Sequence, residues 1–162
     1  MTGLNGTFER FYREHRQELF TYALAITRCA ARAEDAVQEA FCRLYRLAPA
    51  PDELKAYAFR TVRNAALDIA RRPWPAAAID ESIFDPAPGP PHDAAGRELA
   101  QRAAAALKSL GDEEREAIVL HLYGDMTFRE IAELCATPLG TVTARYQRGL
   151  EKLRTLMEAD NG

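Results

Sequence analysis

The stretch TFREIAELCATPLGTVTARYQRGLEKLR, residues 127–154, decides the fold of this chain. Thr127 and Glu130 have the spacing of a capping box, which predicts a short helix that begins at the next residue after the threonine. Thr137 followed by Pro138 is typical of an N-cap and the first helical position, so a second helix begins soon after the first ends. Two helices joined by so tight a turn predict a helix-turn-helix.

The second helix of this motif has an apolar face and a polar face. The apolar positions, which repeat at helical spacing, are Leu139, Val142, Tyr146, Leu150, Leu153 and Met157. The opposite arc contains Thr141, Ala144, Arg145, Gln147, Arg148 and Lys152. Arginine and glutamine can read base edges while flanking cations hold phosphates, so this arc predicts docking on DNA.

The rest of the chain divides by composition. Upstream of the motif, helices are expected at about 98–109 and from a cap at Asp112 to near Gly124. Six of the nine prolines lie in the net acidic stretch 73–97, which has no sustained period and is predicted to be a flexible linker. Fully extended, it would span up to ~80 Å.

The N-terminal segment, residues 1–72, predicts a helical bundle. Helices are expected at 7–27, with Thr7 as the cap, and at about 33–47 and 53–72. The exposed face of the third helix carries Arg60, Arg63, Asn64, Leu67 and Arg71. Arginines suit phosphates and asparagine suits a base edge, so this face is a second candidate for DNA, although a solvated surface explains it equally well.

The totals exclude several classes of protein. With 48% hydrophobic and 28% charged residues, net charge -3, and no apolar run near the roughly 20 residues of a membrane span, we expect a cytoplasmic protein without membrane insertion. Apolar spacings of three and four dominate on both sides of the linker, with no alternating run long enough for a strand, so we expect an all-α fold. The widely separated Cys29, Cys42 and Cys135 predict reduced thiols. The histidines have neither metal nor triad spacing, so we expect no metal, no cofactor and no enzyme.

Two motif sets in order resemble one family. The segments AEDAVQEAFCRLY (33–45) and AYAFRTVRNAALDIARR (56–72), then the linker, then the helix-turn-helix, closely resemble the extracytoplasmic-function (ECF) sigma factors of bacterial RNA polymerase. The resemblance implies that residues 1–72 are region 2, which binds the β′ clamp of core RNA polymerase and opens the minus-ten promoter element. Residues 98–162 would be region 4, which binds the minus-thirty-five element and the β flap.

The resemblance also implies roles for single residues. Polymerase contacts are expected at Asp35, Gln38, Glu39 and Arg43. Minus-ten DNA contacts are expected at Arg60, Arg63, Asn64, Asp68 and Arg71, with the loop Leu47 to Asp52 as the pocket for a flipped base. Minus-thirty-five contacts are expected at His121, Arg129, Thr141, Thr143, Ala144, Arg145, Gln147, Arg148 and Lys152.

The chain departs from the family pattern at three places. Tyr57 and Ala58 stand where tryptophan and leucine are usual, and the minus-ten loop is short and rich in proline. Thr143 and Ala144 stand where a cation and a serine are usual. This last change predicts weak DNA binding by region 4 alone, with specific promoter binding only inside the polymerase holoenzyme.

Other readings stay open. The chain could be a sigma-like protein that binds polymerase or an anti-sigma factor without directing initiation, or a helix-turn-helix transcription regulator. An anti-sigma factor is a candidate partner that would occupy the same docking faces. Control of the protein would come from such a partner or from packing of its two domains on each other.

Overall fold

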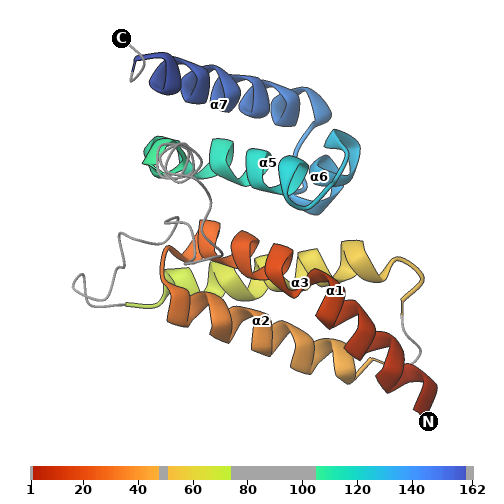
Figure 1. Ribbon diagram of the computed structural model, residues 1–162. Helices are drawn as coiled ribbons and strands as arrows, with labels where there is room; N and C mark the ends of the chain where they lie inside the picture. Colours follow the sequence, from red (N-terminus) through yellow and green to blue (C-terminus); the bar gives the residue numbers. More distant parts are fainter. Residues whose placement is uncertain (1, 48–50, 74–104, 160–162) are drawn as a thin grey trace, which may run out of the picture.

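Helices make up the part of the chain that the structure, a computed structural model, describes (Figure 1). This part covers residues 2–47, 51–73 and 105–159, and it contains no strand, which confirms the all-α prediction. The predicted linker beyond Pro73, residues 48–50 of the predicted minus-ten loop and residues 98–104 lie outside the described residues.

Three helices, α1 (Thr2–Thr27), α2 (Ala30–Tyr45) and α3 (Leu54–Arg71), pack side by side as the N-terminal bundle. Two predicted starts were late: α1 begins before Thr7 and α2 begins before residue 33. The helix ends at Thr27 and Arg71 lie close to their predicted positions. The fully buried side chains at the centre include Leu19, Tyr22, Leu44, Phe59 and Val62.

A buried arginine joins two helices of this bundle. Arg32, near the start of α2, donates hydrogen bonds to the carbonyl of Ile69 and, at 2.9 Å, to that of Arg72. Carbonyls at a helix C-terminus lack partners within the helix, so a cation there satisfies them. Arg32 thereby fixes the end of α3 against the first turn of α2.

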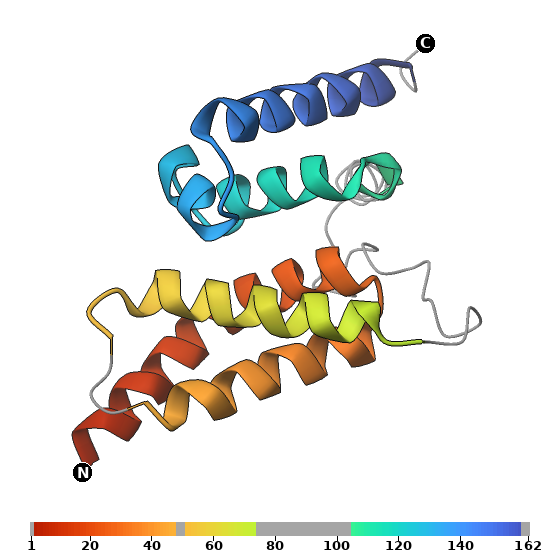
Figure 2. The ribbon, with the colours of Figure 1, turned by 180° about the vertical axis from the view of Figure 1, so that it is seen from behind.

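The C-terminal half consists of a helical turn at 105–109 followed by α5 (Asp112–Leu122), α6 (Phe128–Leu134) and α7 (Leu139–Ala159). The N-cap of α5 is Gly111 rather than the predicted Asp112, and the Glu114 carboxylate accepts from the Gly111 amide at 3.4 Å. Seen from either side, α7 forms one outer layer, α5 and α6 the next, and the N-terminal bundle lies below them (Figures 1 and 2).

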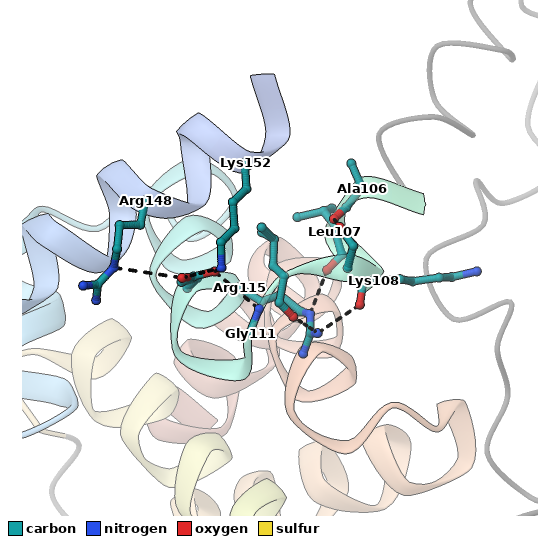
Figure 3. A network of polar contacts seen from close by, with 10 residues as sticks. Ala106, Leu107, Lys108, Gly111, Arg115, Arg148 and Lys152 are labelled. Carbon is teal, nitrogen blue, oxygen red and sulfur yellow. Dashed lines mark hydrogen bonds and ion pairs between the residues drawn. The ribbon is translucent and has the colours of Figure 1, made fainter. Parts of the chain in front are cut away.

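A second buried arginine holds the start of α5 in place (Figure 3). Arg115 is fully buried and donates to the carbonyls of Leu107 at 3.0 Å and Leu110 at 2.7 Å. It also donates to the Asp112 carboxylate at 3.0 Å and to the carbonyl of Ala25 in α1 at 3.3 Å. The same side chain therefore ties the 105–109 turn to α5 and ties both to the N-terminal bundle.

The two halves of the chain pack directly on each other. Helix α5 lies on α1, and α6 lies on α3. Val119 and Leu120 of α5 and Ile131 of α6 belong to the same buried apolar cluster as the core of the N-terminal bundle. The described residues therefore form one continuous core across the two predicted domains.

Candidate nucleic-acid interface

The predicted helix-turn-helix is present, and local hydrogen bonds explain its sharp turn. The Glu130 amide donates to the Thr127 hydroxyl at 3.1 Å, and the Thr127 amide donates to the Glu130 carboxylate at 3.2 Å, so the capping box is confirmed. At the other end of α6, Ala136 has a φ of 50°, and the Thr137 amide donates to the Ala132 carbonyl at 3.0 Å. This is a Schellman ending with alanine where glycine is usual.

The start of α7 differs from the prediction in detail. The helix begins at Leu139, and the Thr137 hydroxyl donates to the Cys135 carbonyl at 3.0 Å, back toward α6, so it is not seen capping α7. Val142 and Gly149 of the apolar face are buried, whereas Leu139 is 43% exposed. Gly149 allows α7 to approach α5 closely, because a β-carbon at this position would lie 2.5 Å from the Ile118 Cδ1 atom.

Three cations of the recognition helix α7 lie against acidic residues in the first turn of α5. Arg145 pairs with Glu113 at 3.3 Å. Lys152 pairs with Glu114 at 2.9 Å, and Arg148 approaches the same carboxylate at 4.0 Å (Figure 3). The hydrogen bond from Lys152 holds the pKa of Glu114 below its usual range. The cations expected to meet phosphates therefore already have intramolecular counter-charges.

His121, a predicted minus-thirty-five contact, lies in an aromatic cluster. Its ring stacks on Phe128 with the ring centroids 4.4 Å apart and meets the Tyr146 ring edge at 4.8 Å. The Nδ1 atom lies 2.8 Å from the Met126 carbonyl. These contacts give the half-buried ring a packing role that connects α5, α6 and α7, which the sequence analysis did not anticipate.

The other predicted residues of this interface lie on or beside the outer side of the helix-turn-helix. Arg129, Gln147 and Arg148 are exposed, while Thr141, Thr143, Ala144 and Arg145 are half-buried. The Thr143 hydroxyl donates to the Gly140 carbonyl at 3.0 Å, one turn back along α7. The polar arc is therefore available to a ligand.

The predicted minus-ten face of α3 is only partly assembled. Arg60, Asn64, Asp68 and Arg71 are exposed, and Asp68 pairs with Arg71 at 3.7 Å. Arg63, expected on the same exposed face, instead points into the contact between the two halves of the chain, where its side chain is 22% exposed. Its partner there is Glu116 of α5, 53 positions along the chain, and no pattern within α3 could indicate that contact.

Arg63 takes part in a polar cluster centred on Glu116 of α5. The Glu116 Oε1 atom accepts hydrogen bonds from Arg63 Nε at 2.6 Å, Tyr22 Oη at 2.7 Å and Cys135 Sγ at 3.2 Å. We call Tyr22, Arg63, Glu116 and Cys135 the Glu116 cluster. Burial alone would lower the pKa of Arg63, but the hydrogen bond and charge of Glu116 raise it above its usual value.

The predicted polymerase face of α2 is accessible. Asp35, Gln38 and Arg43 are exposed, and the half-buried Glu39 pairs with Arg43 at 2.6 Å, one helical turn apart. Gln38 also lines a groove of about 380 Å³ between α1 and α2, together with Tyr12 and Arg16. The face therefore offers both charges and a recess to a protein partner.

Two successive parts of the chain match known sequence families. Residues 11–75 match Sigma-70 region 2 and residues 100–153 match Sigma-70 region 4. The chain is 30% identical to the ECF RNA polymerase sigma factor SigE of Mycolicibacterium smegmatis over 91% of its length, and it spans 60% of that relative's length. It is 29% identical to the RNA polymerase sigma factor CarQ of Myxococcus xanthus, covering 96% of the chain and 91% of the relative.

The chain belongs to the ECF sigma factors. Proteins of this family are non-enzymatic transcription initiation factors that bind core RNA polymerase and promoter DNA. The N-terminal bundle is therefore sigma region 2, and the part that contains α5 to α7 is sigma region 4.

Two solved structures share the fold of this sigma factor. One is the sigma factor RpoE in complex with the anti-sigma factor NepR from Bartonella quintana, with a TM-score of 0.66, 22% identity, and 94% and 99% of the two chains covered. The other is CnrH in complex with the cytosolic domain of CnrY, with a TM-score of 0.67, 24% identity, and 98% and 92% covered.

The cysteines, the potential metal ligands and the apolar content of the helices of this sigma factor remain to be described. The three cysteines are free: Cys29 is buried, Cys42 exposed and Cys135 half-buried. Within the described ranges, no group of three or more His, Cys, Asp or Glu side chains is arranged to hold a metal ion. In those ranges, too, none of the helices is long and apolar enough to cross a bilayer.

Proposed function

We propose that this ECF sigma factor binds core RNA polymerase through the exposed face of α2 and directs it to promoters through α3 and α7. The observation that carries this proposal is the order of regions 2 and 4 in one chain, with an accessible polar face on each. Asp35, Gln38, Glu39 and Arg43 would form the polymerase contact. This assignment makes the chain an initiation factor that acts only as part of the holoenzyme.

In region 4, Arg148 and Gln147 are the best placed to read bases. Both are exposed on the outer side of α7, and an arginine and a glutamine can each make two hydrogen bonds to a purine edge. Arg129, Arg145 and Lys152 would hold phosphates beside them. In region 2, Arg60, Asn64 and Arg71 would contact the minus-ten strand.

Reconstitution with bacterial core polymerase tests this function. The purified protein is added to core polymerase, and transcription is run on fragments of genomic DNA to find discrete start sites. We expect Arg148→Ala to weaken promoter binding by the holoenzyme roughly tenfold, as expected for loss of one bidentate base contact. Arg154→Ala removes another exposed arginine of α7 outside the predicted arc and is the matched control.

The alternative is a sigma-like interaction protein. It is supported by Thr143 and Ala144, which lack the cation and the serine usual in the family. Binding to core polymerase without any defined transcript would establish this alternative and overturn the initiation proposal. An anti-sigma factor remains a proposed partner, since one of the two related structures is a sigma factor in complex with an anti-sigma factor.

A further inference from the structure

The contact between regions 2 and 4 contains polar groups whose partners lie far apart in the sequence. Glu116 of α5 accepts from Tyr22 of α1, from Arg63 of α3 and from Cys135 just after α6. Its side chain is 16% exposed, so these are largely desolvated hydrogen bonds, two of them across the domain boundary. A carboxylate so placed needs its partners, because an unpaired buried charge is costly.

Two further contacts cross the boundary beside the Glu116 cluster. The Arg115 guanidinium reaches the Ala25 carbonyl at 3.3 Å, and Arg28 pairs with Asp112 at 3.4 Å. Apolar side chains of α5 and α6 join the region 2 core in the same contact. The closed arrangement therefore combines apolar burial with geometrically specific polar contacts.

We call the packing of region 4 on region 2 closure, and it affects the two proposed DNA surfaces differently. It engages Arg63, which lies one position before Asn64 on the proposed minus-ten face. It leaves exposed the outer side of α7 and the polymerase face of α2, which lie on opposite sides of the molecule, away from the contact (Figures 1 and 2). The closed form could thus meet polymerase but could not offer the Arg63 guanidinium to a DNA phosphate.

We propose that the Glu116 cluster is an autoinhibitory latch that keeps the free sigma factor closed, with Arg63 withheld from DNA, without any anti-sigma factor. The latch opens when core polymerase separates the two regions. Glu116 contacts neither DNA nor polymerase in the proposed function, so its role is confined to the free protein. This inference rests on the proposed function for its biological meaning, but closure itself is measured independently.

A charge reversal tests the latch in the full-length free protein. Glu116→Arg places a cation against Arg63 and should open the molecule, seen as a larger radius of gyration in X-ray scattering. Glu158→Arg makes the same change of charge at an exposed position near the end of α7 and should leave the molecule closed. Arg63→Glu alone should also open it, whereas the double variant Arg63→Glu/Glu116→Arg should restore the closed form.

DNA binding and thiol reactivity give two further readouts. Free Glu116→Arg should bind single-stranded minus-ten DNA roughly threefold to tenfold more tightly than Glu158→Arg, which controls for the added charge. The Cys135 thiol should be alkylated several-fold faster in Arg63→Glu, in which the Glu116 carboxylate is unchanged, because opening removes the burial that region 2 gives the thiol. Tyr22→Phe, which loses one donor to Glu116 but keeps the buried ring, should shift all readouts the same way by less.

Several outcomes would overturn the latch. A wild-type protein that is already extended, a Glu116→Arg variant that stays closed by scattering, or an open variant with the DNA affinity of Glu158→Arg would each do so. Failure of the double variant to close would show that the Arg63–Glu116 contact does not hold the domains. Transcription by holoenzymes that contain wild type or Glu158→Arg tests the proposed function separately. A result against the latch would therefore leave the proposed function unaffected.

Discussion

At the scale of single residues, Glu114 would compete with DNA for the α7 cations that the proposed function assigns to the promoter. It accepts hydrogen bonds from Lys152 at 2.9 and 3.0 Å and lies 4.0 Å from Arg148. A phosphate can bind these cations only when the carboxylate releases them. On the proposed function, the acidic first turn of α5 would therefore reduce the intrinsic affinity of region 4 for DNA.

Replacing this carboxylate should strengthen DNA binding. We expect Glu114→Gln to raise the affinity of the holoenzyme for promoter DNA by about threefold and to steepen its salt dependence, because more phosphate charge is then neutralised. Binding is measured at several salt concentrations, with the exposed Glu158→Gln as the charge-matched control. Unchanged or weaker binding would mean that Glu114 positions the two cations for DNA rather than withholding them.

The same residues show which site contacts are readable from sequence. The capping box of Thr127 and Glu130 was predicted correctly because both partners lie within one helical turn. The partners of Glu114 and Glu116 were missed, since Lys152 lies 38 positions and Arg63 lies 53 positions away. Helical periodicity gives the face of each residue but not the helix that will cover that face.

At the scale of elements, the end of α6 carries backbone strain. Ala136 has a φ of 50°, a left-handed conformation in which a β-carbon crowds the following carbonyl. Glycine has no such penalty, which is why it is the usual residue at this position. The turn is nevertheless held by the Schellman hydrogen bonds and by the packing of both its helices.

Removing this β-carbon should stabilise region 4. We expect Ala136→Gly to raise the free energy of unfolding by up to about 1 kcal/mol, while Ala144→Gly within α7 should lower it by a similar amount. Urea denaturation followed by circular dichroism measures both changes. A loss of stability in Ala136→Gly would show that the strain is smaller than the entropy cost of glycine in the unfolded chain.

Gly149, where α7 packs on α5, is the opposite case, because adding a β-carbon there should destabilise the protein. A β-carbon here would lie 2.5 Å from Ile118 Cδ1 and 3.3 Å from Ile118 Cγ1, and Ile118 is 1% exposed. We expect Gly149→Ala to lower the free energy of unfolding by about 1–3 kcal/mol through overpacking. Gly140→Ala, where no atom lies within 4 Å, should instead be neutral or stabilising. Thermal unfolding of both variants decides, and equal melting temperatures would contradict the clash.

Sequence reasoning was reliable for the ends of elements that carry strong local signals. The ends of α1 at Thr27 and of α3 at Arg71, and the start of α6, were located to within about a residue. The starts of α1 and α2 were both placed too late. For α1 the reason is that Thr7 looked like a cap yet lies inside a longer helix. At the start of α2, Arg32 is bonded to the end of α3, a contact that no local signal indicates.

At the scale of the whole molecule, the chain was expected to be two modules on a long tether, with their packing on each other only a hypothesis. The described residues instead share one core. Val119 and Leu120 of α5 and Ile131 of α6 are at most 1% exposed and belong to the same cluster as the region 2 core. The helical periodicity of region 2 does not indicate which of its surfaces packs on region 4, and the same is true of region 4. The closed arrangement therefore could not be derived from either sequence segment alone.

Closure should depend on pH through Tyr22 of the Glu116 cluster. Burial and the Glu116 carboxylate raise the pKa of Tyr22 well above 10.0. The pKa of the Cys135 thiol is also raised, from 9.0 to about 12, by burial and by Glu116, but this thiol shares region 4 with Glu116 and keeps the carboxylate beside it when the regions separate. Tyr22 donates to Glu116 across the boundary and is protonated in the closed form.

The sign of the effect follows from these directions. Below pH 10.0 the Tyr22 phenol is protonated whether the protein is open or closed, so its full contribution to closure is present. As the pH rises through 10.0, the open form loses a proton that the closed form retains, and closure weakens. We therefore expect the radius of gyration of the free protein to increase above pH 10.0. Tyr22→Phe has no phenol to ionise, so it should show no further opening over this range. Identical opening curves for wild type and Tyr22→Phe would show that the phenol proton is not part of what holds regions 2 and 4 together.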